Sequence, residues 1–109
     1  MASLGFKNKK NQSDTELCAG YLKALGDPNR LQLMKALRSS PLTVTDLSIM
    51  LEAELANVSH HLRVLYRTGL VITERDGKYI YYQLNRDIVG HKSVANALDL
   101  GCCRLEMRS

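Results

Sequence analysis

Residues 54–84 change periodicity halfway along, and this change restricts the fold more than any other feature of the chain. Over residues 54–67 apolar side chains recur at helical spacing, and Gly69 is a typical stop for a helix. The runs VITER and KYIYYQL that follow are rich in β-branched and aromatic residues, and Asp76-Gly77 between them is a strong hairpin signal. The stretch therefore predicts a helix followed at once by a two-stranded hairpin. The inward positions of the helix are Leu55, Val58, Leu62 and Leu65.

Three more helices are predicted before this stretch. The segment DTELCAGYLKALG carries an apolar stripe and ends at Gly26. Asp27-Pro28 then begins a second helix, because Asp caps free N–H groups and Pro suits the first helical position. Thr43, with Asp46 three residues later, resembles a capping box and begins a third. The apolar positions of the three helices are Leu17, Tyr21, Leu22 and Leu25; Leu31, Met34 and Leu37; and Val44, Leu47 and Leu51.

Residues 87–99 are predicted to form a last helix, which is apolar through Ile88, Val94, Ala95 and Leu98. The expected order is therefore α-α-α-α-β-β-α, a mostly helical (α+β) fold with a β-hairpin wing. The third and fourth helices form a helix-turn-helix. We expect a flexible arm over residues 1–13, one folded domain over residues 14–100 and a cysteine-containing tail over residues 101–109.

Composition limits the class of protein. The chain has 109 residues, enough for one domain, and its net charge of +4 with a pI near 9.1 is a mild hint of nucleic acid that also fits many unrelated proteins. No apolar run approaches the roughly 18 residues of a membrane span, and the start lacks the apolar core of a signal peptide. We therefore predict a cytoplasmic protein without a membrane partner. In that reducing compartment its three cysteines are expected to be thiols rather than a disulfide framework.

The outer face of the fourth helix is a candidate DNA-binding surface. If Leu55 is at the centre of the buried stripe, a step of about 100° per residue brings polar and basic side chains to the opposite face. Arg and Asn can pair with base edges or phosphates, and a hydroxyl at the flank can reach a phosphate. Arg75 and Lys78 bracket the hairpin turn, where they can grip the backbone. The helix residues are Ala56, Asn57, Ser59, His60, Arg63, Val64 and Arg67.

Other readings of these residues stay open. A charged helix face is often merely solvated, and a winged helix can bind protein partners only. His60 and His61 do not form a metal site together, because adjacent helical residues point about 100° apart. His60 is expected to face outward and His61 to be structural, near the edge of the packed face.

The runs LGDPNRLQLM and VSHHLRVL, with GLV and then an Arg, a Gly and YYQL behind them, resemble the ArsR/SmtB family of bacterial repressors over residues 17–84. The resemblance implies a homodimeric winged helix-turn-helix, paired through its terminal helices, that sits on an operator and releases it when an inducer binds. It implies that Asn57, Ser59, His60 and Arg63 lie on the recognition helix. The family often opens this helix with a Ser-Gln-Ser-like sequence, whereas here Glu54-Leu55-Ala56 stands there, with a poorer cap.

The resemblance also bears on inducer sites. One family site resembles Cys-x-Cys-Asp-Leu, and the matching residues 43–47 carry no thiol. A second uses Asp, His and Glu around the last helix; the first Asp falls on Asp87, but the His positions fall on Val89 and Leu100 and the Glu position on Cys103. His91 is a loose candidate at best. Both sites are therefore expected to be absent.

Cys18 on the first helix and Cys102-Cys103 after the last remain as candidate sensing residues, since the resemblance implies a dimer that pairs through these terminal helices. Three thiolates suit a soft metal or metalloid ion such as arsenite, and two nearby thiols could instead form a disulfide or polysulfide link. Arg104 and Arg108 would favour the thiolate form. Cys18 could also be a small buried hydrophobe and the Cys-Cys pair incidental, which would leave a constitutive repressor without a sensor. A thiol enzyme is a remote alternative, because no local Cys–His pair is evident.

Overall fold

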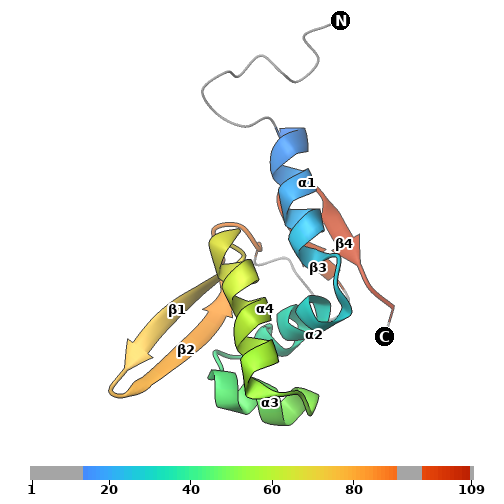
Figure 1. Ribbon diagram of the computed structural model, residues 1–109. Helices are drawn as coiled ribbons and strands as arrows, with labels where there is room; N and C mark the ends of the chain where they lie inside the picture. Colours follow the sequence, from blue (N-terminus) through green and yellow to red (C-terminus); the bar gives the residue numbers. More distant parts are fainter. Residues whose placement is uncertain (1–13, 91–96, 109) are drawn as a thin grey trace, which may run out of the picture.

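The computed structural model describes residues 14–90 and 97–108, and the predicted arm over residues 1–13 lies outside them (Figure 1). Four helices come first, followed by two hairpins. The helices are α1 (Asp14–Leu25), α2 (Pro28–Leu37), α3 (Val44–Leu51) and α4 (Leu55–Arg67). The strands are β1 (Val71–Asp76), β2 (Tyr79–Leu84), β3 (Ala97–Asp99) and β4 (Arg104–Glu106). The mostly helical fold with a hairpin wing is confirmed.

Local capping groups set the helix ends as predicted. The Asp27 carboxylate accepts from the N–H groups of Asn29 and Arg30 at the start of α2, where Pro28 occupies the first turn. Thr43 and Asp46 make the reciprocal bonds of a capping box at the start of α3. Gly69 follows α4 with a φ of 87°, which a residue with a Cβ adopts only with strain. Each of these signals acts over three or four residues of chain.

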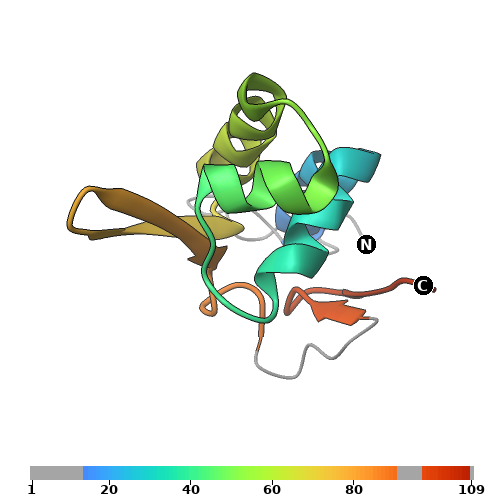
Figure 2. The ribbon, with the colours of Figure 1, turned by 90° about the horizontal axis from the view of Figure 1, so that it is seen from below.

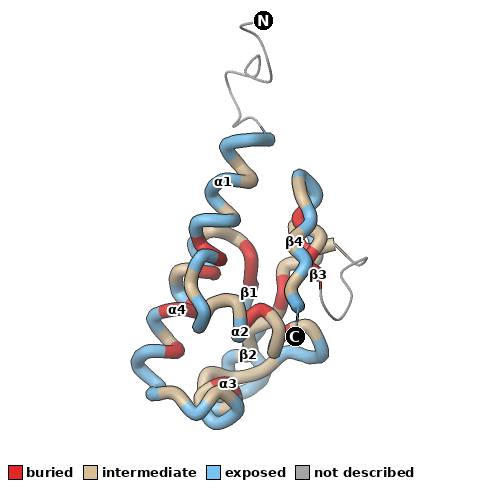
Figure 3. Tube along the Cα trace, turned by 90° about the vertical axis from the view of Figure 1, so that its right-hand side faces the viewer, coloured by how far each residue is buried: buried red, intermediate tan, exposed pale blue. Residues whose placement is uncertain are grey.

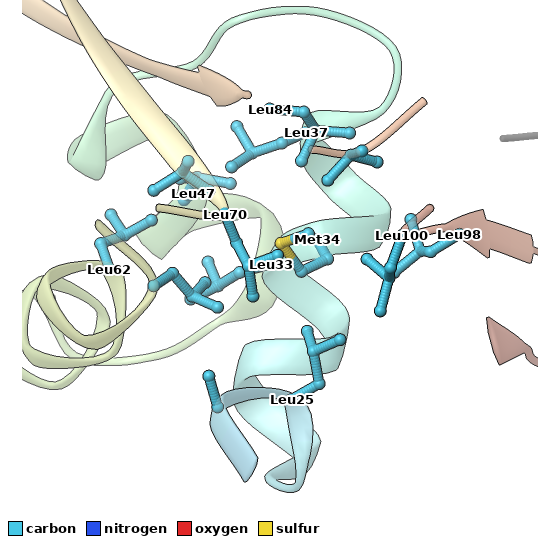
Figure 4. Packing of buried hydrophobic residues seen from close by; sticks show 14 of the residues in the cluster. Leu25, Leu33, Met34, Leu37, Leu47, Leu62, Leu70, Leu84, Leu98 and Leu100 are labelled. Carbon is cyan, nitrogen blue, oxygen red and sulfur yellow. The ribbon is translucent and has the colours of Figure 1, made fainter. Parts of the chain in front are cut away.

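The core lies where α2, α4 and the start of the first hairpin meet. Figure 4 shows Leu33 and Met34 of α2 packed toward Leu62 and Leu70, and all four side chains are fully buried. The first turns of α1 lie outside this core (Figure 3). Of its predicted buried stripe only Leu25 is buried, whereas Leu22 is 43% exposed. The apolar face of α1 is therefore only partly covered within one chain.

Strands β1 and β2 form the wing, which extends away from the helices on one side of the molecule (Figures 1 and 2). They pair antiparallel from Val71 opposite Leu84 to Asp76 opposite Tyr79. The turn residues are therefore Gly77 and Lys78, one position later than the predicted Asp76-Gly77. Gly77 has a φ of 64°, so the chain places its glycine at the first turn position, where a two-residue hairpin needs a positive φ. Two backbone hydrogen bonds between Leu42 and Tyr82 tie the base of the wing to the loop before α3.

The predicted last helix is wrong where the structure describes it. After β2 the chain makes a single turn in which the N–H groups of Ile88 and Val89 bond to the Asn85 carbonyl. Residues 97–99 then form β3, which pairs with β4 on the side of the molecule opposite the wing (Figure 2). A short apolar run such as ALDL fits a helix or a strand, and here the backbone of residues 104–106 supplies strand partners. Val94, Ala95 and His91 lie outside the described residues.

None of the helices in the described ranges is both long enough and apolar enough to span a bilayer.

Candidate nucleic-acid interface and cysteine cluster

The buried side of α4 is defined by Val58, His61, Leu62 and Leu65. At about 100° per residue, the centre of this stripe is rotated by roughly 70° from Leu55. Leu55 is accordingly 52% exposed, so its predicted inward position is wrong. Val64, predicted to face outward, is half-buried against the core. The register of the helix is therefore set by its later turns, because its first residue extends past the core.

The opposite side of α4 carries the side chains predicted to read DNA. With the corrected register, Ala56, His60, Arg63 and Arg67 lie within about 30° of the centre of the outer face, and all four are exposed. Asn57 is exposed at one flank, and Ser59 is half-buried toward the wing. Glu54 makes no capping hydrogen bond to the start of α4, as its poorer cap geometry predicted. Three groups that are basic or titratable thus share one solvent-facing surface.

The wing adds a second group of basic side chains. Arg75 and Lys78 are exposed at the hairpin tip, where Arg75 Nε donates to the Gly77 carbonyl at 3.3 Å and the Lys78 ammonium lies 5.8 Å from the centre of the Tyr79 ring. A hollow separates the wing from α4, and its walls come from both elements. It is lined by Ser59, Arg63, Tyr66, Thr73, Ile80 and Tyr82. The outer face of α4 and the wing therefore adjoin across this hollow, with Arg63 on its helix side.

His61 lies on the inner side of α4 and is only 9% exposed, so its predicted position on the packed face is confirmed. Its Nδ1 lies 3.1 Å from Arg30 Nη1, and its Nε2 lies 3.4 Å from Asn29 Nδ2 and 4.0 Å from the Asp27 carboxylate. Partial burial would raise the pKa of Asp27, but the backbone N–H groups of Arg30 and Asn29, with the electrostatic effect of His61 and Arg30, outweigh it. The pKa of Asp27 is therefore held below its ordinary value of 3.8.

The sequence pattern did not predict these partners of His61. The residues concerned were singled out in the sequence, because DPNR is the motif that begins α2. It could be read only as a helix start, since nothing local says that α4 packs its histidine against the first turn of α2.

The three cysteines meet between α1 and the turn of the β3–β4 hairpin. Cys18 of α1 is joined to Cys102 by a disulfide with a Cα–Cα distance of 6.0 Å, and Cys103 keeps its thiol. The Sγ of Cys103 lies 2.9 Å from that of Cys18, and the three sulfurs all lie within 4.8 Å of one another. The expectation of three free thiols is therefore wrong for this state. The hairpin lies beside α1 and brings together residues that are 84 positions apart (Figure 1).

The same cluster is the only group of three or more His, Cys, Asp or Glu side chains in the described ranges that is close enough to hold one metal ion. The positions that match the family's two other inducer sites do not form a metal site. Val89 and Leu100 are buried in the core, and Thr43 and Asp46 bond to each other at the start of α3. If the disulfide is reduced, the cluster offers three soft sulfur donors.

Comparison with known proteins identifies the family. The sequence model of "Bacterial regulatory protein, arsR family" matches residues 27–73, from the cap of α2 into β1. A cadmium resistance transcriptional regulatory protein, CadC, from Listeria innocua is 34% identical over 87% of this chain and 76% of its own length. An arsenical resistance operon repressor from Staphylococcus xylosus is 32% identical over 81% of this chain and 88% of its own length.

A solved structure agrees with the sequence matches. It is the homodimeric winged helix-turn-helix DNA-binding domain of a possible ArsR-family transcriptional regulator from Mycobacterium bovis. The two chains are 29% identical, with a TM-score of 0.61 over 69% of this chain and 74% of that one. The resemblance noted in the sequence is thus confirmed on residues that span the helices and the wing. This chain belongs to the ArsR family of bacterial regulatory proteins.

Proposed function

We propose that this chain is a transcriptional repressor that binds double-stranded operator DNA and dissociates when its cysteine cluster changes state. The observation that carries the proposal is the exposure of His60, Arg63 and Arg67 on the outer face of α4, which adjoins across a hollow a wing tipped by the exposed Arg75 and Lys78. The relatives are named as regulators and repressors of resistance, which supports this function and gives no support to a thiol enzyme.

Each side chain has a role in this proposal. Arg63 and Asn57 pair with base edges or phosphates in the major groove, as their donor and acceptor groups allow. Ser59 reaches a phosphate from the flank of α4, and the basic groups of the wing grip the backbone. Ala56, at the centre of the outer face, lets the helix approach the groove closely.

The DNA-binding part is tested with a duplex selected from a random-sequence library by the reduced protein. Fluorescence anisotropy then measures the dissociation constant over a range of salt concentrations. We expect the affinity to fall steeply with salt, because each neutralised phosphate releases about 0.9 counterion. Salt-insensitive or absent binding would refute the proposal and favour a winged helix that binds protein partners.

The cysteine cluster supplies the sensing part of the proposal. As thiols, Cys18, Cys102 and Cys103 would offer three donors suited to a soft metal ion or arsenite. Oxidation joins Cys18 to Cys102, and two protons and two electrons pass to an oxidant such as a peroxide or a reactive sulfur species. The disulfide uses two of the three donors, so the ion-bound and disulfide states exclude each other. The cadmium and arsenical resistance named for the relatives supports the ion-bound state.

A variant with Cys102→Ser and Cys103→Ser tests this sensor. Mass spectrometry after exposure to zinc, arsenite or a sulfide donor identifies the adduct of the wild type, and gel shifts report release from the selected duplex. We expect the double variant to bind the duplex as the wild type does and to stay bound under every treatment. Release from the double variant would place the sensor elsewhere. A wild type that never responds would indicate a constitutive repressor.

We also propose that the chain acts as a homodimer. The half-covered apolar face of α1, where Leu22 is 43% exposed, supports a partner subunit there, and the domain from Mycobacterium bovis is homodimeric. One helix-turn-helix reads only a half-site, so paired half-sites about one turn apart require two-fold symmetry. Light scattering should give the mass of a dimer, and a monomeric mass in the DNA-bound state would contradict this.

A further inference from the structure

His61 contacts α2 from the inner side of α4, away from the proposed DNA-binding surface. It is the one buried polar side chain among residues 14–90 and 97–108. A buried polar group destabilises the fold unless it is hydrogen-bonded, so its partners constrain how α4 sits on the helices beneath it. Those partners all come from the first turn of α2 and its cap.

Arg30 connects His61 to a third helix. Its Nη1 lies 3.1 Å from His61 Nδ1, while its Nε donates to the carbonyl of Ala24 in the last turn of α1. A guanidinium can hold both contacts at once because its N–H donors point in separate, rigid directions. One side chain therefore joins the end of α1 to the buried side of α4.

The contact with Arg30 also determines the tautomer of His61. Arginine only donates, so Nδ1 must accept and the proton of the neutral ring lies on Nε2. The Asn29 Nδ2 group, 3.4 Å from Nε2, also only donates, and a neutral ring accepts at one nitrogen only. We assign acceptance to Nδ1, because Arg30 is the nearer donor at 3.1 Å, and the Nε2 proton then faces the Asp27 carboxylate at 4.0 Å. The backbone N–H groups of Asn29 and Arg30 in turn hold that carboxylate in place. The Arg30 contact at Nδ1 therefore links the buried side of α4 to the first turn of α2.

We propose that Arg30 is the positioning residue through which the state of the cysteine cluster reaches α4. Cys18 precedes Ala24 by six residues on α1, roughly 9 Å along a straight helix. A change in the link between Cys18 and the β3–β4 turn shifts α1, the Ala24 carbonyl moves with it, and Arg30 passes that movement to His61. This inference rests on the proposed function, because it needs a sensor on α1 and a reader on α4.

The variant Arg30→Lys tests the inference, since lysine keeps the charge but has a single nitrogen that cannot hold both contacts. The dissociation constant for the selected duplex is measured after reduction with a phosphine and after oxidation with diamide. We expect a difference on the order of tenfold between the two states of the wild type, and less than about threefold in the variant. Arg86→Lys is the matched control, because Arg86 also donates to a backbone carbonyl, that of Arg38, and should keep the wild-type ratio.

Nitrogen-15 NMR of the histidine rings adds a readout that a loss of stability alone would not change. His61 should be a single Nε2–H tautomer in the wild type and a mixture in Arg30→Lys. If circular dichroism shows that this variant does not fold, His61→Gln and His61→Leu replace it. Glutamine still accepts from Arg30 and should keep the response, whereas leucine cannot and should lose it.

The outcomes separate this inference from the function on which it rests. Equal affinities of reduced and oxidised wild type would remove sensing through the disulfide and this inference with it, whereas the ion-bound part of the proposed function is decided by the gel shifts with zinc and arsenite. A wild-type response that persists in Arg30→Lys or His61→Leu would overturn the inference alone, as would a His61 ring that carries its proton on Nδ1.

Discussion

Reduction of the Cys18–Cys102 disulfide should lower the free energy of unfolding strongly, because this bond closes nearly the whole domain into one loop. The two cysteines are 84 positions apart. In the chain-entropy relation a loop of that length removes about 15 cal/mol/K from the unfolded state, or about 4.6 kcal/mol at room temperature. With a urea m-value of about 1–3 kcal/mol per M, the unfolding midpoint should fall by at least about 1.5 M.

The assay is urea unfolding followed by circular dichroism, at one protein concentration, with and without a phosphine reductant. Cys18→Ser should unfold at the midpoint of the reduced wild type and ignore the reductant. Cys103→Ser, which keeps the disulfide, should respond as the wild type does. Equal midpoints for reduced and oxidised wild type, or a Cys18→Ser variant that still responds to reductant, would refute the idea that this bond ties the tail to α1.

Three other predictions concern single residues. Arg63→Ala should weaken binding to the selected duplex by about 1–3 kcal/mol and change the free energy of unfolding by less than about 0.5 kcal/mol, because the side chain is exposed; equal losses would make Arg63 structural. Thr43→Ala should lower the free energy of unfolding by about 1 kcal/mol in urea, since it removes half of a capping box, whereas the exposed Thr45→Ala should change it little. The lowered pKa of Asp27 means that its ionised form contributes stability that is fully present above about pH 5 and is lost as the pH falls through the native pKa, below 3.8. Asp27→Asn should therefore flatten the fall in melting temperature between about pH 5 and pH 3, and an unchanged slope would contradict this.

The exposed side chains of the proposed DNA-binding surface could largely be predicted from the sequence. The spacing of Val58, Leu62 and Leu65 defines the buried side of α4, so the exposure of His60 and Arg63 follows from helical geometry. The error at Leu55 has the same origin, because periodicity cannot tell how far the first turn of a helix extends beyond the core that covers the rest.

Short-range signals also predicted the helix starts. Asp27-Pro28 and the Thr43–Asp46 pair act on N–H groups within three residues. Their capping of the helix starts therefore does not depend on how distant segments pack. The turn of the wing shifted by one residue, from Asp76-Gly77 to Gly77 and Lys78. Strand register, unlike the existence of the hairpin, depends on the cross-strand pairs and on the backbone bonds between Leu42 and Tyr82.

The contacts between segments that are far apart in the sequence were determined by tertiary packing alone. Residues 97–99 became a strand because residues 104–106 lie opposite them, and Cys18 met Cys102 because that hairpin lies along α1. Arg30 contacts His61, 31 residues away, because α4 packs on the first turn of α2. Such contacts are made by backbone and side chains that are brought together only after the helices have packed, and no pattern within a few residues of Cys18 or Arg30 contains their partners. Local chemistry sets where elements begin and which side faces inward, whereas the free energy of burying all of them together sets which residues become neighbours.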